Sequence, residues 1–221
     1  LMNEYFGPRE PVDAELYKAF QRDFGPRFFG FASHEWAYGA VTGWDESGQR
    51  PRTRAEGAKR LAQELHRQMR LTYGKLYAGE GYRLPYHLAF REGLPAAYAE
   101  VGENIPATPL QVAVLRGAAR QYGRPWGFYI SAWYRNSVTT YDSPDSNTLH
   151  MSGAIFSGPF AGHSVSLMER MLYLGYLSGA TLVHHESDAF AESIWVEDYG
   201  KQGRYRISPF GVATRRWFDF T

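Results

Sequence analysis

Residues 179–190 have the sequence Gly-Ala-Thr-Leu-Val-His-His-Glu-Ser-Asp-Ala-Phe. A helical pattern precedes this stretch, a short apolar run begins it, and two imidazoles and two carboxylates end it. This order is typical of a buried parallel strand with polar side chains at its carboxyl end. Because side chains alternate along a strand, His184 and Glu186 share one face. The stretch therefore predicts that Glu186 lies at the mouth of an active site.

Other apolar runs have the same character and alternate with helical patterns. Strand-like runs cover residues 27–36, 95–104 and 126–134, and a shorter one, residues 1–7, includes Asn3-Glu4. Helical periodicity covers residues 13–25, 53–76, 86–92, 108–123, 164–178 and 208 onward. Residues 135–162 have little helical period and are predicted to form a loop over the active-site cleft. The alternation of strand and helix predicts a parallel sheet with right-handed crossovers.

The class of α/β fold follows from what the strands carry. No GxGxxG or Walker motif follows any strand, which disfavours a nucleotide-binding doubly wound fold. Polar side chains at the ends of several strands favour a (β/α)8 TIM-type barrel. The chain has 221 residues, fewer than the roughly 250 of a typical barrel. We therefore predict one barrel domain over residues 1–221, or the C-terminal part of a barrel truncated at its N-terminus.

Composition excludes several classes of function. The formal net charge of +1 provides no basic field for nucleic acid or an anionic membrane. Cysteine is absent, which excludes disulfides, cysteine-based zinc sites and thiol nucleophiles. No run of 18 apolar residues exists, so no membrane span is expected. Aromatic residues make up 16% of the chain, and their faces suit both a core and stacking on sugar rings.

Carboxylates end four of the apolar runs, at Glu4, Glu35, Glu103 and Glu186. Glycoside hydrolysis needs two carboxyl groups across the scissile bond, one as acid and one as nucleophile or base. We predict Glu186 as nucleophile or base and Glu103 as acid. Glu35, Glu4 and Asp188 are the alternative or supporting carboxylates. The competing structural interpretation is that such a glutamate pairs with an arginine or caps a helix.

Polar and aromatic side chains near the same strand ends are the predicted sugar contacts. On the fourth strand Ser131 and Trp133 share a face, and His184 is expected to face the same cavity. Trp36 and Trp133 are candidate stacking platforms, although core packing is the commoner role of tryptophan. The predicted substrate-binding set is His34, Trp36, Asn104, Ser131, Trp133, His163 and His184.

Three other kinds of functional site have less support in the sequence. His34, His163, His184 and His185, with nearby carboxylates, permit a metal site, but no HExxH or other fixed spacing supports one. No Gly-x-Ser-x-Gly sequence occurs, which disfavours a serine triad. A row of arginines on one helix, at positions 116, 120 and 124, is typical of a solvated face rather than of a nucleic-acid site.

Two parts of the sequence resemble bacterial glycoside-hydrolase-like barrels. The first comprises Gly-Glu-Asn-Ile at 102–105 and the run from Leu115 to Gly127; the second comprises Gly-His-Ser at 162–164, an Arg170-containing helix, Ser-Gly-Ala at 178–180, Glu186, and Ser-Pro-Phe-Gly at 208–211. Together they cover about half the chain. The resemblance implies a (β/α)8 barrel, a carbohydrate substrate and a carboxylate pair.

In the large retaining clan of such barrels, the acid/base glutamate follows an asparagine at the fourth strand and the nucleophile ends the seventh. Glu186 is the best match to the nucleophile. Asn3-Glu4 has the Asn-Glu order of the acid/base motif, whereas Glu103-Asn104 has it reversed. The resemblance therefore leaves the choice of acid between Glu103 and Glu4 open.

The leading hypothesis is a glycoside hydrolase that acts on an oligo- or polysaccharide without a cofactor or metal. One alternative is a non-catalytic carbohydrate-binding domain on a barrel remnant, and another is a metal-dependent hydrolase that uses the histidines. The expected partner is a carbohydrate, with no nucleic acid and no membrane, and a homo-oligomer is neither indicated nor excluded. The compartment stays open, with a secreted or periplasmic protein preferred to a cytoplasmic one.

Overall fold

The computed structural model describes residues 7–81, 83–102, 107–131, 137–139, 156–158, 164–185 and 209–221. It divides the chain into two compact units, which are described separately. Unit 1 comprises Leu1–Ala99 and Pro109–Trp126, and unit 2 comprises Glu100–Thr108 and Gly127–Thr221. The single barrel domain over residues 1–221 stays a prediction.

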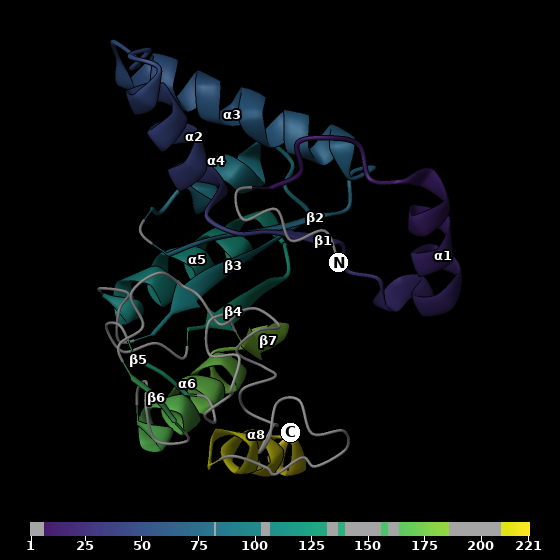
Figure 1. Cartoon of the computed structure of the whole chain (residues 1–221), viewed down its shortest axis with the longest axis vertical. Coiled ribbons are helices and arrows are strands. Elements are labelled where there is room, and N and C mark those ends of the chain that lie inside the picture. Colours follow the sequence, from purple (N-terminus) through teal and green to yellow (C-terminus); the bar gives the residue numbers. More distant parts are fainter. Residues whose placement is uncertain are drawn as a thin grey trace. The chain divides into compact units, whose positions relative to one another are not determined.

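A five-stranded sheet has the order β1-β2-β3-β4-β7 (Figure 1). Its strands are β1 (Phe31–Ser33), β2 (Leu76–Glu80), β3 (Ala96–Val101), β4 (Trp126–Ile130) and β7 (Leu182–His185). The pairings β1–β2, β2–β3 and β4–β7 are parallel, which confirms the predicted parallel α/β arrangement. The predicted set of eight barrel strands is not found, because the sheet contains five strands over the described ranges.

A separate two-stranded parallel sheet lies within the segment predicted to be a loop. Its strands are β5 (Ser137–Thr139) and β6 (Phe156–Gly158). Each has only three residues, too few for a hydrophobic period to be detected in the sequence. The prediction that residues 135–162 form a loop is therefore wrong for these six positions.

Most helices of unit 1 begin where the sequence indicates. The helical elements are α1 (Ala14–Phe24), the short 3-10 helix η1 (Gly25–Arg27), α2 (Trp36–Glu46), α3 (Arg54–Leu71), α4 (Tyr86–Arg91) and α5 (Thr108–Tyr122). Asp13 caps α1 by accepting from Leu16 N at 2.8 Å. Thr53, where the predicted helical segment begins, caps α3 by accepting from Glu56 N at 3.1 Å.

Strand β2 was not predicted, because Leu76 continues the helical spacing of the residues before it. The structure ends α3 at Leu71 instead. Tyr73 and Gly74 follow with φ values of 54° and 74°, and Gly74 N donates to Met69 O at 2.7 Å. This left-handed turn terminates the helix, so that Leu76–Glu80 are free to form a strand.

Helix α2 was also not predicted. The sequence was expected to be strand-like through Trp36, but β1 ends at Ser33 and α2 begins at Trp36. The buried apolar residues that suggested a longer strand fill the core from the first turn of the helix instead. Figure 1 shows α2 next to the long helix α3.

The core of unit 1 surrounds β2 and β3. Every residue of both strands is buried, as expected for parallel strands that are covered on both faces. Gly79 lies opposite Tyr98 in the register of the two strands. A Cβ atom at residue 79 would overlap the Tyr98 ring, so the absence of a side chain there makes room for Tyr98.

Unit 2 contains β4, β7 and the helices α6 (Val165–Leu177) and α8 (Pro209–Phe220). The two helices pack against each other. Ser164 caps α6 by accepting from Leu167 N at 3.2 Å, at the start of the predicted helical segment. Gly175 of α6 lies close to Phe128 and Val183, so α6 covers the face of β4 and β7 that carries these side chains. None of the helices described is both long and apolar enough to cross a membrane.

Candidate functional site

The end of β1 carries a polar cluster that includes two of the predicted site residues. His34 and Glu35 follow the strand, and each is only 7% exposed. The Tyr98 hydroxyl donates to Ser33 O at 2.9 Å and also contacts His34 Nδ1. The Tyr98 hydroxyl therefore contacts both the backbone of Ser33 and the ring of His34, and it ties the end of β1 to β3.

Glu35 connects β1 to α2 through an unusual backbone conformation. Its φ and ψ angles are 44° and 39°, in the left-handed region, and its side chain makes no capping hydrogen bond to α2. For a residue with a Cβ atom this conformation costs about 1–2 kcal/mol. Such strain persists only where surrounding contacts impose it, and it concentrates at functional sites.

Glu80, at the end of β2, supplies the missing cap of α2. Its Oε1 accepts from Ala37 N, in a short hydrogen bond, and from Tyr38 N at 3.1 Å. These are two of the N–H groups at a helix start that have no partner within the helix. The Glu80 side chain is 0% exposed, and its Oε2 has no hydrogen-bond partner among the described residues.

Burial makes Glu80 an unusual acid. Removal from water raises the pKa of its carboxyl to about 8, and the negative charge of Glu35 raises it as well. The N–H groups of Ala37 and Tyr38, and the charge of Arg83, act in the opposite direction. The neutral carboxylic acid is therefore the main form of Glu80 at pH 7.

Further hydrogen bonds fix the chain just after Glu80. The Tyr86 hydroxyl donates to Glu80 O at 3.0 Å and lies 3.2 Å from Gln111 Oε1. Gln111 Nε2 donates to Gly81 O. Because Tyr86 and Gln111 are both buried, α4 and α5 hold the backbone at the end of β2 in one position.

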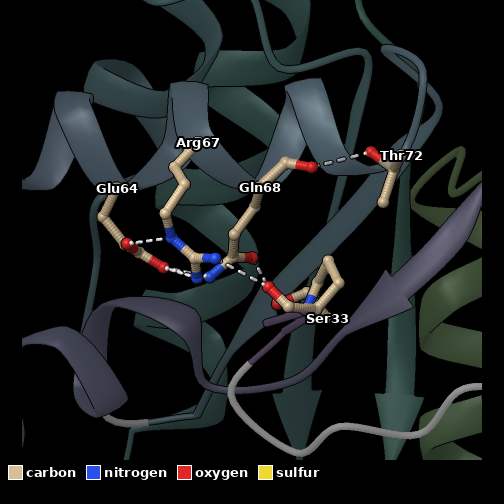
Figure 2. A network of polar contacts seen from close by, with 6 residues as sticks. Ser33, Glu64, Arg67, Gln68 and Thr72 are labelled. Atoms are coloured by element: carbon tan, nitrogen blue, oxygen red, sulfur yellow. Dashed lines mark hydrogen bonds and ion pairs between the residues drawn. The ribbon is translucent and has the colours of Figure 1, made fainter. Parts of the chain in front are cut away.

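A second network connects the end of β1 to α3 (Figure 2). Ser33 Oγ donates to Gln68 Oε1, and Gln68 Nε2 donates to Glu64 Oε1, both at 2.8 Å. Arg67 binds Glu64 through two nitrogens and donates to Pro8 O at 2.9 Å. The network therefore joins α3, the end of β1 and the backbone next to Gly7.

Gly7 packs directly onto this second network. A Cβ atom there would overlap the Gln68 side chain and lie 2.6 Å from Ser33 Oγ. Its φ of 94° is also a conformation that side chains disfavour. Glycine is thus required at this position by both space and backbone conformation.

In unit 2, His184 of β7 lies beside Tyr129 of β4. The two residues are in register, and their ring centroids are 5.1 Å apart in an edge-to-face arrangement. Burial lowers the pKa of His184 to about 4, so its imidazole is neutral at pH 7. The predicted alternation is confirmed here, because the neighbouring pair Phe128 and Val183 faces α6.

Three other polar residues lie near the strand ends of unit 2. Ser131 is 2% exposed, and its N–H donates to Val101 O at 2.8 Å. His185 Nε2 lies 3.0 Å from Thr214 Oγ1 of α8, which connects β7 to the last helix. Glu100, in β3, is buried as well.

The predicted site residues are therefore distributed over three groups. His34 and Glu35 lie together in unit 1, and Ser131 and His184 lie in unit 2. Trp36 is 2% exposed in the core of unit 1 and presents no ring face on which a sugar could stack. The remaining predicted residues lie outside the described ranges: Glu4, Glu103, Asn104, Trp133, His163, Glu186 and Asp188.

Sequence reasoning missed Glu80 and Tyr98. The run Leu-Tyr-Ala-Gly-Glu at 76–80 has the same form as the other strands, an apolar segment that ends in a carboxylate. Gly74 was the available signal, because glycine frequently terminates a helix. Tyr98 carried no comparable signal, since its role depends on the neighbouring strand.

Within the described residues, no group of three or more His, Asp or Glu side chains is arranged to hold a metal ion. Comparison of the chain with family models, curated proteins and solved structures gave no match.

Proposed function

We propose that the protein is a glycoside hydrolase that cleaves an oligo- or polysaccharide by a two-carboxylate mechanism. The supporting observation is that parallel strands end in ionisable side chains. His34 and Glu35 follow β1, and Glu80 ends β2. Further along the chain Glu103 comes shortly after β3, and Glu186 comes directly after β7. Parallel barrels build their active sites from such strand ends.

The order of the strands supports a barrel-type arrangement. From β1 to β4 each strand lies next to the one that precedes it in the chain. A doubly wound nucleotide-binding sheet instead reverses its strand order at a switch point, where the ligand binds. The sequential order shows no such reversal, and it is the order found in a (β/α)8 barrel.

The proposed catalytic roles come from the sequence. Glu186 is the nucleophile or base and Glu103 the acid, with Glu4, Glu35 and Asp188 as other carboxylates of the site. A glycosidase acid must keep its proton near neutral pH, and burial is the usual cause. Glu80 is an example of such a neutral carboxyl in this chain, with a pKa of about 8.

Hydrolysis of a panel of polysaccharides and aryl glycosides by wild type, Glu186→Gln and Glu103→Gln tests the proposal. Each substitution is expected to lower kcat/KM by about 10³-fold, a typical loss for a positioned acid or base. Glu15→Gln is the matched control, because Glu15 is exposed on α1, where it pairs with Lys18. Full activity of Glu103→Gln together with an inactive Glu4→Gln would move the acid to Glu4.

The second candidate function is carbohydrate binding without catalysis. The described sheet has five strands rather than eight, which fits a barrel remnant. This alternative predicts that a folded wild type binds polysaccharide, that Glu186→Gln binds equally well, and that neither releases reducing ends. Turnover by wild type would exclude it.

A further inference from the structure

We propose that Glu80 is a positioning residue of the site: from β2 it caps the first turn of α2 and thereby holds Glu35 and His34 in place at the end of β1. The catalytic part of this inference rests on the proposed hydrolase, whereas the capping part does not. No sequence motif assigns a role to Glu80, since position 80 was expected to lie beyond a long helix.

Helix α2 is capped from outside its own sequence. A helix is ordinarily capped by the side chain of the residue just before it, through the N–H groups of its second or third residue. At α2 that residue is Glu35, whose side chain makes no capping bond. Ala37 N and Tyr38 N, the second and third N–H groups, bind Glu80 Oε1 instead. The cap therefore comes from another strand: Glu80 lies 43 residues after Ala37 and 42 residues after Tyr38 in the sequence.

The connection between β1 and α2 is short. Only His34 and Glu35 separate the end of β1 from α2, so the position of the first turn determines where their side chains lie. Glu35 is held in the left-handed region, a conformation that an unrestrained glutamate would leave. On the strand side, Tyr98 holds Ser33 O and His34 Nδ1. Glu80 completes this restraint from the helix side.

The two oxygens of the Glu80 carboxyl group have different roles. Oε1 accepts both N–H groups, so in the neutral acid the proton resides on Oε2. Glutamine has the same shape and keeps an acceptor oxygen at Oε1, whereas methionine fills a similar volume without an acceptor. Glu80→Gln and Glu80→Met therefore form a matched pair that separates the cap from the packing.

Hydrogen exchange followed by NMR tests the cap. In Glu80→Met the Ala37 and Tyr38 amides are expected to exchange about 5-fold faster or more than in wild type, while Glu80→Gln stays within about 2-fold; a typical cap contribution of ~1 kcal/mol corresponds to about 5-fold. Thr53→Ala is the control, because it removes the cap of α3 and is expected to accelerate exchange there alone. Unchanged exchange at Ala37 and Tyr38 in Glu80→Met would overturn the proposal.

Positioning needs a separate measurement. The His34 ring resonances, assigned with His34→Gln, are expected to shift in Glu80→Met and to remain unchanged in Glu80→Gln. Resonances that do not move in Glu80→Met would show that the cap does not position the site, and would overturn that part. If Glu80→Met does not fold, wild type still decides: Ala37 and Tyr38 amides that are protected from exchange support the cap, and amides that exchange as fast as unstructured ones contradict it.

Activity distinguishes the two proposals. In an active wild type, Glu80→Met is expected to lower kcat/KM by about 5-fold or more, with Glu80→Gln restoring it to within about 2-fold, since a cap of ~1 kcal/mol corresponds to about 5-fold. Unchanged activity in Glu80→Met would overturn the catalytic part of the inference. A folded wild type that hydrolyses nothing would overturn the glycoside hydrolase proposal, while exchange and His34 shifts would still test Glu80.

Discussion

Burial shifts the pKa values of two ionisable groups in opposite directions: that of Glu80, at the end of β2, and that of His184, in β7. At the end of β2, burial raises the pKa of the Glu80 carboxyl to about 8. In β7, burial lowers the pKa of the His184 imidazole to about 4. Removal from water disfavours the charged form in both cases, so the acid keeps its proton and the base gives its proton up.

Glu80 and His184 differ in the polar groups that surround them. Glu80 Oε1 faces two N–H groups at a helix start, which favour negative charge and partly oppose the effect of burial. At His184, a hydrogen bond to His185 O at 3.1 Å raises the pKa and partly opposes the effect of burial. At neutral pH the protein therefore has an acid that can donate and a base that can accept, each made neutral by burial.

The largest expected effect is on packing next to Glu80. Gly79→Ala would push a methyl group into the Tyr98 ring, whereas Gly175→Ala in unit 2 would place one 2.8 Å from a methyl of Val183. We expect Gly79→Ala to lower the free energy of unfolding by about 3 kcal/mol and Gly175→Ala by about 1 kcal/mol, since rigid neighbours tolerate overpacking least.

Urea denaturation measures both losses. Gly117→Ala is the control, because residue 117 has open space around it in α5 and is expected to gain up to about 1 kcal/mol from helix propensity. Equal losses at positions 79 and 175 would show that the Tyr98 ring is not the rigid element we infer.

The next effect is the pH dependence caused by Glu80. Its folded pKa of about 8 lies above the ordinary value of 4.5, so its contribution to stability is complete below pH 4.5 and is lost as the pH rises towards 8. Between pH 6.5 and 8 we expect the free energy of unfolding to fall by up to about 1.4 kcal/mol per pH unit. Glu80→Gln should abolish this slope, and Glu15→Gln should retain it; a slope that persists in Glu80→Gln would contradict the assignment.

His184 is expected to have a smaller effect with the opposite sign. Its folded pKa of about 4 lies below the ordinary 6.5, so its contribution to stability is present above pH 6.5 and is lost as the pH falls towards 4. Between pH 4 and 6.5, the slope of the free energy of unfolding against pH, measured from denaturation curves, should differ between wild type and His184→Gln. Since the Glu80 contribution changes in the other direction over most of this range, the comparison is best made in the Glu80→Gln background. Identical slopes would show that the ring is not excluded from water.

The smallest expected effect is at Glu35. Its left-handed backbone favours glycine, so Glu35→Gly should be more stable than Glu35→Ala by about 1 kcal/mol. Thermal or urea denaturation of the two variants, both of which lack the carboxylate, isolates the backbone term. Equal stability would mean that the turn changes its conformation when the side chain is removed.

The parallel α/β arrangement was predictable from local signals, and the site only in part. Asp13, Thr53 and Ser164 cap helices through their own side chains, so short sequence patterns identify the three helix starts. The start of α2 has no such signal, because its cap comes from Glu80 on another strand. The ends of short strands such as β5 and β6 are equally difficult, since three residues establish no period.

His34 and Glu35 were predicted as site residues because they follow an apolar run, whereas Trp36 next to them belongs to the core. The sequence places all three at the same strand end, and only the direction of α2 separates their roles. That direction depends on contacts with β2, which no pattern within residues 27–36 contains.

The cap that Glu80 provides has a consequence for engineering this chain. The β1–α2 connection is not a transferable module, because two of its helix-start donors bind a carboxyl from β2. Grafting residues 31–46 onto another scaffold without an acceptor equivalent to Glu80 would leave the helix start frayed. Libraries that diversify positions 34–38 should therefore diversify position 80 at the same time.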